Sequence, residues 1–466
     1  MSEREIFLVE DAHAGDLGPA ALVRPVFDLV VGALTQRQRV ERLAGRKVSG
    51  ALVRGHLVGL DGRFQERHSD ASSTTDSRLF INAAWLPDEQ TWPLVESLGP
   101  GEYLRSDEYA LLALASRPKG GARHFPDPEM GKEWRSDPFS WNLNPGGIER
   151  VEVSGKTSDI PLLRPGEVVA AAAESIAADS DVASKSFVLR HSWELVSVQE
   201  ELLKSDLEAL IADDQRLAKG GLRRLVNDPG AGIHVRGTEA YAAEGLRLSA
   251  PVSLDAEAGP ILLGENAGIG PFSVLEGPLF VAEGAQILGG RVAHSYIGPG
   301  CRIRGEVAQS TFLGWTNKAH EGFVGHSYFG EWVNLGALTT TSNLKNTYGE
   351  IRVGPRRDQA TGLTKLGSVV GDHTRTAIGT MMATGSLIGV GVNLVGSEGI
   401  APHWLPSFVW GVRERASAFD LARFLEIAAR VLARRDRSLS AADREVLVAV
   451  HAASAAEREE YLAHRR

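Results

Sequence analysis

The sequence predicts an α/β domain at the front of the chain, followed by a left-handed parallel β-helix that ends in α-helices. Three observations support this fold class. Aliphatic residues from about position 245 onward recur at every sixth position. Before that point, short apolar runs alternate with helical segments. After Trp410, apolar residues follow i, i+3, i+4 spacing, which is typical of helices.

The six-residue register is the most specific signal. It matches neither the helical period of 3.6 nor the alternation of a strand. Six residues per side and three sides per coil indicate hexapeptide repeats, in which the aliphatic side chain points into a narrow prism and a small residue turns the corner. A glycine-rich β-sandwich is the alternative, but a fixed period favours a repeat fold. The register runs through Leu263, Ile269, Leu275, Val281 and Ile287, then Ile297 and Ile303, Phe329 and Leu335, and Ile388 and Leu394.

The front of the chain mixes predicted strands and helices. Residues 6–10, "IFLVE", and residues 78–87, "RLFINAAWLP", predict strands, whereas residues 32–45 predict a helix that Gly45 closes. Residues 192–214 predict a connecting helix. Together these elements indicate an α/β arrangement.

The terminal helices carry one clear start signal, since Ser440 before "AADRE" predicts an N-cap and first turn. We therefore expect four parts in chain order. They are an α/β domain over residues 1–190, a connecting helical segment over 191–235, the β-helix over 236–410 and C-terminal helices over 411–466.

Composition excludes several classes of function. The formal net charge of −9 argues against a nucleic-acid surface, and small-molecule substrates fit better. Cys301 is the only cysteine, so a disulfide within the chain and a cysteine-based zinc site are excluded. No run of about 18 apolar residues and no signal-peptide pattern occurs. We expect a cytoplasmic protein with no membrane partner.

Four stretches carry a resemblance to a known family: "LVRPVFDLVVGALTQRQRVERL", "LFINAAWLP", "SWELVSVQEELLKSDL" and "NKAHEGFVGHSYFGEWVNLGALTTTSNLKNTYG". Through them the chain resembles the GlmU family, the bifunctional uridylyltransferase/acetyltransferases of UDP-N-acetylglucosamine synthesis. The resemblance implies a nucleotidyltransferase-like front domain and an acyltransferase-like β-helix.

For the front domain, the resemblance implies that a sugar 1-phosphate attacks a nucleoside triphosphate and releases pyrophosphate, with Mg²⁺ held by carboxylates. The family loop Gly-x-Gly-Thr-Arg is missing, and Gly15 and Gly18 stand apart in "VEDAHAGDLGPAALVRP". Arg24 is the candidate cation and Asp11 the candidate metal ligand. The alternative is that Arg24 pairs with a structural carboxylate and Asp11 caps a turn.

For the β-helix, the resemblance implies an acyl-CoA-dependent transfer in which a histidine accepts the proton of the attacking amine or hydroxyl. "NKAHEGFVG" makes His320 that candidate base. Asn334 matches the sugar-contacting asparagine, and Asn343 and Lys345 match a segment that contacts the acyl donor. His326, six residues after His320, is a second candidate that stacks along the same face or bonds a turn.

Departures from the family pattern concern the acceptor. Phe323 replaces an expected tyrosine and Leu338 replaces the second glycine of "GAGT". The resemblance implies a homotrimeric transferase of nucleotide-sugar metabolism that uses a nucleoside triphosphate, a sugar 1-phosphate and acyl-CoA. The alternative is a catalytically silent trimeric scaffold or sugar-nucleotide sensor.

Overall fold

The computed structural model describes most of the chain and divides it into two compact units. The described residues are 4–10, 12–57, 78–99, 103–105, 111–116, 187–216, 221–225, 230–396 and 399–464. Unit 1 comprises residues 1–17, 24–29 and 34–190, and unit 2 comprises residues 18–23, 30–33 and 191–466. The finer division at 190, 235 and 410 stays a prediction.

Unit 1 contains a mixed five-stranded sheet in the order β4-β1-β5-β8-β7. The first three strands run parallel, and β8 runs antiparallel to both of its neighbours, β5 and β7. The strands are β1 (Glu5–Val9), β4 (Gly50–Leu52), β5 (Arg78–Asn82), β7 (Tyr103–Arg105) and β8 (Leu111–Ser116). The smaller elements are β3 (Leu34–Thr35), β6 (Trp85–Leu86), which pairs with β9 (Phe187–Val188), and the 3-10 helices η2 (Val26–Asp28) and η3 (Gly55–Leu57).

The helices of unit 1 follow local signals in the sequence. Helix α1 (Gln36–Ala44) starts at a capping box in which the Thr35 side chain accepts from the Gln38 amide, and it ends at Gly45 with φ 66°. The helix predicted over 32–45 is thus confirmed with a later start. The strand predicted over 78–87 divides into β5 and β6, because residues 83–84 form a turn. Helix α2 spans Trp92–Ser97. The 3-10 helix η1 (Ala12–Ala21) follows the first strand, and its residues from Gly18 onward belong to unit 2.

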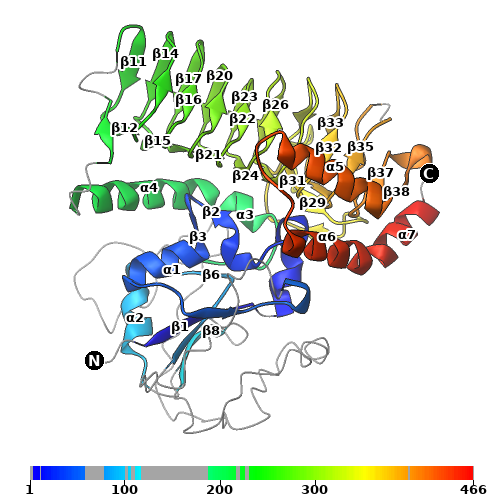
Figure 1. Ribbon diagram of the computed structural model, residues 1–466, viewed down its shortest axis with the longest axis horizontal. Coiled ribbons are helices and arrows are strands. Elements are labelled where there is room, and N and C mark those ends of the chain that lie inside the picture. Colours follow the sequence, from blue (N-terminus) through cyan, green and yellow to red (C-terminus); the bar gives the residue numbers. More distant parts are fainter. Residues whose placement is uncertain are drawn as a thin grey trace. The chain divides into compact units, whose positions relative to one another are not determined.

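Unit 2 is built around a parallel β-helix with three faces, which confirms the predicted repeat fold (Figure 1). Face A is a ten-stranded sheet, parallel after its first strand: β10 (Arg223–Arg224), β12 (Ala240–Ala242), β15 (Ile261–Leu263), β18 (Leu279–Val281), β21 (Tyr296–Ile297), β24 (Thr311–Gly314), β27 (Tyr328–Glu331), β31 (Ser368–Val370), β34 (Ser386–Ile388) and β36 (Trp404–Leu405).

Face B holds six parallel strands and the further pair β28 and β33. They are β11 (Ile233–Arg236), β14 (Val252–Asp255), β17 (Ser273–Glu276), β20 (Gly290–Ala293), β23 (Glu306–Ala308), β26 (Phe323–Gly325), β28 (Thr340–Thr341) and β33 (Met381–Met382).

Face C holds five strands and then four more, which isolated bridges at Asn334 connect. They are β13 (Arg247–Leu248), β16 (Gly268–Ile269), β19 (Gln286–Ile287), β22 (Arg302–Ile303), β25 (Asn317–Lys318), β32 (Arg375–Thr376), β35 (Asn393–Leu394), β37 (Val409–Trp410) and the antiparallel β38 (Ser417–Ala418). A hairpin of β29 (Arg352–Val353) and β30 (Gln359–Ala360) interrupts the coils.

The interior of the β-helix consists of the residues that carry the six-residue register. On face A, Leu263, Val281 and Ile297 are in register on neighbouring strands and fully buried. Phe312 and Phe329 continue this line with their rings stacked 4.8 Å apart. Burying each such side chain contributes roughly 1.5–3 kcal/mol, so the repeated inward line stabilises every coil against the next.

One row of corners differs from the sequence prediction of small residues. Trp315, Trp332, His373 and Phe408 turn this corner at φ between 54° and 61°, and Gly391 turns it on the coil between His373 and Phe408. Helix α5 (Leu421–Ala433) lies against part of this row, where its Phe424 ring packs edge-on against His373 and Phe408. Packing against a helix therefore offsets the backbone strain that large residues meet at positive φ.

Further helices complete unit 2. Helices α6 (Ala441–Ala453) and α7 (Ala455–Ala463) follow α5, and the Ser440 side chain caps α6 as predicted. The predicted connecting helix divides into α3 (Glu194–Ser197) and α4 (Gln199–Arg216). The remaining elements are β2 (Val30–Val31) and η6 (Arg413–Arg415). No helix in the described part of the chain is long and apolar enough to cross a bilayer.

Helix α4 lies along face A (Figure 1). Its Leu203, Leu207 and Ile211, spaced by four residues, pack with Tyr241 and Leu262 of that face. The short segment 30–33 is held in the same unit, because Asp206 of α4 accepts from the Ala33 amide at 2.9 Å and the Tyr328 hydroxyl donates to the Val30 carbonyl at 3.0 Å.

Candidate functional sites

In unit 1, the carboxyl end of β1 is occupied by an ion pair. Glu10 is buried, and its two carboxylate oxygens accept from the Val26 amide at 2.8 Å and the Arg54 amide at 2.9 Å. The Arg54 guanidinium adds two bonds of 3.1 Å to the same carboxylate. These bonds hold the segment after β1 against the segment after β4, at the edge of a parallel sheet where ligands bind in such folds.

One of the two residues that the sequence singled out, Arg24, lies beside this pair. Arg54 also donates to the main-chain oxygen of Arg24 at 3.1 Å, so Arg24 sits next to the Glu10 carboxylate through its backbone. Asp11 lies outside the described residues. The roles of Arg24 as a cation for phosphate and of Asp11 as a metal ligand stay predictions.

A metal site does not follow from the described residues. No group of three or more His, Cys, Asp and Glu side chains in the described ranges is placed to hold a metal ion. Glu10 already makes bonds through both oxygens. Mg²⁺ binding at this edge therefore stays a prediction.

In unit 2, His320 lies on the exposed turn between β25 and β26. Its main-chain oxygen accepts from the Lys318 ammonium at 2.8 Å. Its imidazole has no hydrogen-bond partner within the described chain, which leaves the ring nitrogens accessible to a substrate. On the outer side of the same turn, Arg304 pairs with Glu321 at 2.7 Å.

His326 lies at a different corner from His320, so the expectation that the two histidines stack along one face is wrong. His320 precedes β26 and His326 follows it, and the His326 amide donates to Ala308 of the preceding coil. Six residues span one side of the three-sided coil. Residues that stack on one face are a whole coil apart, as in Ile287, Ile303 and Lys318.

The corner of His326 carries a row of polar side chains. The Asn343 amide donates to the His326 ring nitrogen Nδ1 at 2.8 Å. Burial, together with the smaller effect of the Lys365 charge, lowers the pKa of His326 to about 4, so the ring is neutral at pH 7. Gln309 occupies the same corner one coil earlier and bonds Glu200 of α4. His326 and Asn343, both predicted as binding residues, are thus brought together.

The other two predicted binding residues lie apart from this pair. Asn334 is exposed on face C, where its Oδ1 accepts from Asn317 at 2.9 Å. Lys345 lies at the start of the hairpin insertion, and its ammonium donates to the Glu350 carbonyl at 2.7 Å. Within one chain the structure therefore does not gather His320, Asn334 and Lys345 into one cluster.

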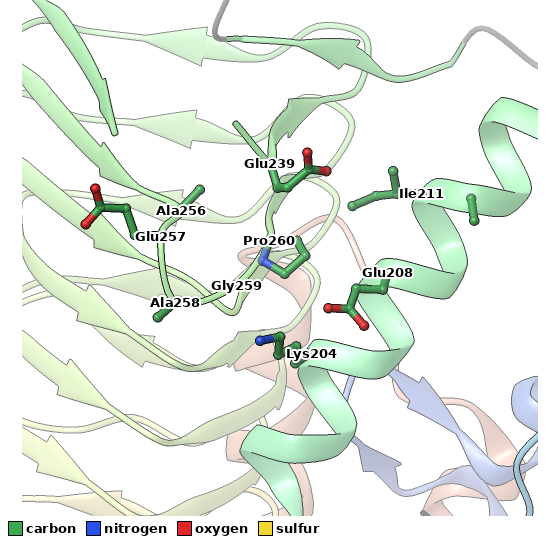
Figure 2. Close-up of a pocket in the computed structure, with 10 residues that line it drawn as sticks. Lys204, Glu208, Ile211, Glu239, Ala256, Glu257, Ala258, Gly259 and Pro260 are labelled. Carbon is green, nitrogen blue, oxygen red and sulfur yellow. The ribbon is translucent and has the colours of Figure 1, made fainter. Parts of the chain in front are cut away.

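Sequence reasoning missed a shallow groove between α4 and the first coils, with a volume of about 420 Å³. Figure 2 shows Glu208 and Lys204 reaching from α4 toward a loop that carries Glu257, Gly259 and Pro260. Three glutamates and one lysine line the groove, which disfavours phosphate groups. None of the predicted site residues lies in it.

Sequence reasoning also missed Lys318. It occupies an inward aliphatic position of face C, in register with Ile303. The signal was present in the sequence, because a lysine there interrupts the line of aliphatic residues.

Comparison with known proteins bears first on the front part of the chain. Residues 6–215 match the family model described as sugar nucleotidyl transferase. The front part of this chain is a sugar nucleotidyl transferase-like domain. The match ends near the C-terminus of α4 and does not include the β-helix.

Curated relatives are similar over limited stretches. The bifunctional protein GlmU of Picosynechococcus sp. is 28% identical over 140 residues, which are 30% of this chain and 24% of the relative. GlmU of Synechococcus elongatus is 24% identical over 228 residues, 44% of this chain and 46% of the relative. A bifunctional sugar-1-phosphate nucleotidylyltransferase/acetyltransferase of Sulfurisphaera tokodaii is 34% identical over 85 residues, 18% of this chain and 21% of the relative. The chain thus spans less than half the length of these relatives.

Solved structures are only distantly similar. The UDP-N-acetylglucosamine acyltransferase of Arabidopsis matches 51% of this chain and 98% of its own, with 14% identity and a TM-score of 0.24. AntD, an N-acyltransferase from Bacillus cereus, matches 46% of this chain and 98% of its own, with 15% identity and a TM-score of 0.20.

Proposed function

We propose that this chain is a cytoplasmic, two-part transferase of nucleotide-sugar metabolism. The observation that carries the proposal is the joining of a sugar nucleotidyl transferase-like domain to a parallel β-helix within one chain. A bifunctional GlmU protein and a bifunctional sugar-1-phosphate nucleotidylyltransferase/acetyltransferase are similar to it over parts of their length. The front domain then acts on a nucleoside triphosphate and a sugar 1-phosphate, and the β-helix acts on acyl-CoA.

In the acyl transfer, His320 takes the proton of the attacking group. An amine or hydroxyl of a sugar attacks the thioester carbon, a C–N or C–O bond forms and the C–S bond breaks. The proton passes from the nucleophile to the imidazole and then to the leaving thiolate, which departs as the free thiol. The exposed turn of His320 suits this role because its ring is accessible from outside the coil.

Asn334 and the pair of His326 and Asn343 serve as substrate contacts in this proposal. Asn334 presents its amide at the exposed surface of face C. His326 is held neutral and bonded to Asn343, so it contacts a polar substrate as a hydrogen-bond partner and not as a charge. Lys345 at the hairpin supplies a cation for a phosphate of the acyl donor.

A homotrimer would explain why His320, Asn334 and Lys345 do not form one cluster within a single chain. An exposed apolar patch of Leu338, Ile378, Met381 and Ile400, each between 42% and 78% exposed, extends over successive coils next to the His320 corner. Leu338 donates its amide to Glu321, the neighbour of His320. A second copy packed on this patch would bring its own polar residues near His320, and three copies would close the assembly.

Two product assays test the proposal. Pyrophosphate release and free-thiol release are measured with a panel of nucleoside triphosphates, sugar 1-phosphates and acyl-CoAs. We expect Arg24→Ala to reduce only pyrophosphate release and His320→Ala to reduce only thiol release, by about 100-fold each. Arg37→Gln, which removes an ion pair with Asp28 elsewhere in unit 1, is the matched control for Arg24→Ala. A wild-type chain that releases neither product overturns the transferase proposal.

A scaffold or sensor is the second candidate function, and the Glu10–Arg54 pair favours it. The Glu10 carboxylate lies at the sheet edge where ligands bind in such folds, yet both of its oxygens bond Arg54. If a sugar nucleotide raises the melting temperature while neither product forms, the chain binds without turnover.

A further inference from the structure

Lys318 places an ammonium group inside the β-helix. On the inward line of face C, Ile287, Ile303 and Lys318 are in register, and Leu335 follows one coil later. Ile303 and Leu335 are buried as expected, and Lys318 is only 2% exposed. A lysine is almost never buried to this extent unless its charge is compensated.

The compensation comes from the backbone of one corner. The Lys318 ammonium donates to the Arg304 carbonyl at 2.6 Å and to the His320 carbonyl at 2.8 Å. These two oxygens belong to the same corner on successive coils. Burial lowers the pKa of Lys318 to about 8, and only the nearby Glu321 opposes this shift. The lysine therefore stays protonated at pH 7 without forming an ion pair of its own.

A methionine would fill this position at lower cost, since replacing a buried charge by an apolar side chain of similar volume is often neutral or stabilising. The fold therefore does not explain the lysine. The ammonium fixes the direction of the His320 carbonyl, which an apolar side chain cannot do. It thereby also fixes the conformation of residues 319–322.

We propose that Lys318 is a positioning residue for His320. It holds the turn from inside the coil while the Arg304–Glu321 pair holds it from outside. The pair is exposed and contributes little, so among the side chains that hold this turn the interior ammonium provides most of the restraint. This inference rests on the proposed acyl-transfer role of His320, because a fixed turn sets the position of the base relative to the substrate.

The test compares Lys318→Met with Leu335→Met in the full-length chain. Leu335 lies on the same inward line one coil further and does not contact His320, so its variant controls for a changed interior. Hydrogen–deuterium exchange of residues 319–322 and the melting temperature are measured for both variants. We expect exchange of the turn to rise at least about tenfold in Lys318→Met alone, at an equal or higher melting temperature.

Acyl transfer supplies the second readout. In Lys318→Met we expect kcat to fall at least about tenfold with KM within about threefold, because binding surfaces stay and only the base is misplaced. Unchanged hydrogen–deuterium exchange at the turn in Lys318→Met overturns the inference. A lower melting temperature of this variant, with kcat and exchange of the turn unchanged, overturns it too. If exchange rises as expected but the wild type transfers no acyl group, Lys318 still orders the turn and the proposed function fails instead.

Discussion

At the scale of single residues, the two histidines of the second unit have opposite environments. His320 is exposed on a turn, whereas His326 is half-buried, bonded to Asn343 and has a pKa lowered to about 4. Their sequence spacing is one side of a coil, which places them at two corners. A neutral, restrained ring suits a binding contact, and an accessible ring suits proton transfer.

His326 makes the folded chain sensitive to acid. Its pKa is lowered from 6.5 in the unfolded chain to about 4 in the fold, so the unfolded state binds more protons between these pH values. Stability is therefore lost as the pH falls from 6.5 to 4, by up to about 3 kcal/mol. Urea unfolding at several pH values measures this loss.

Two variants test whether His326 causes this acid sensitivity. His326→Asn removes the titrating ring, and asparagine tolerates the positive φ of 48° at this corner, so the loss of stability at low pH should shrink. His320→Asn should leave the wild-type pH dependence unchanged. Equal acid sensitivity of wild type and His326→Asn would contradict the account of the corner.

At the scale of elements, the sequence predicted the inward lines of the β-helix because one physical requirement, an aliphatic side chain in a narrow prism, repeats at a fixed period. Leu263, Val281 and Ile297 confirm it. The large residues of the Trp315 corner could not be predicted in the same way. At His373 and Phe408 the positive φ is supported by packing against α5, which is remote in sequence.

Helix α5 is expected to contribute strongly to this corner. Phe424 is fully buried among His373, Phe408 and Phe419. Truncation to alanine leaves a cavity and should destabilise unit 2 by about 3–5 kcal/mol in chemical unfolding. Val448→Ala on the exposed side of α6 should change stability by less than about 0.5 kcal/mol. A small effect of Phe424→Ala would mean that α5 does not support the corner.

At the scale of the whole molecule, the candidate site could be predicted from the sequence only in part. The motif around His320 predicted the candidate residues, but not that Asn334 lies on face C whereas His320 lies on the turn that ends this face one coil earlier. Spacing along the chain does not reveal which side chains of neighbouring copies meet. Lys318 was missed because polar residues are expected on the outside of the coil, whereas this lysine occupies an inward position.

A substitution in the apolar patch beside His320 tests the proposed homotrimer directly. We expect light scattering to show three chain masses for the wild type and one for Ile378→Glu, because a buried charge at the interface has no partner. Val448→Glu places the same charge on α6 and should leave the trimer intact. A monomeric wild type at micromolar concentration would contradict the proposed assembly.

The most direct test of the central claim compares free-thiol release from acyl-CoA by wild type, His320→Ala and His326→Ala, with each variant shown to be folded. The account predicts that His320→Ala loses at least about 100-fold in kcat, whereas His326→Ala stays within about tenfold and changes mainly KM. Full activity of His320→Ala, or a larger loss of kcat in His326→Ala, would contradict it.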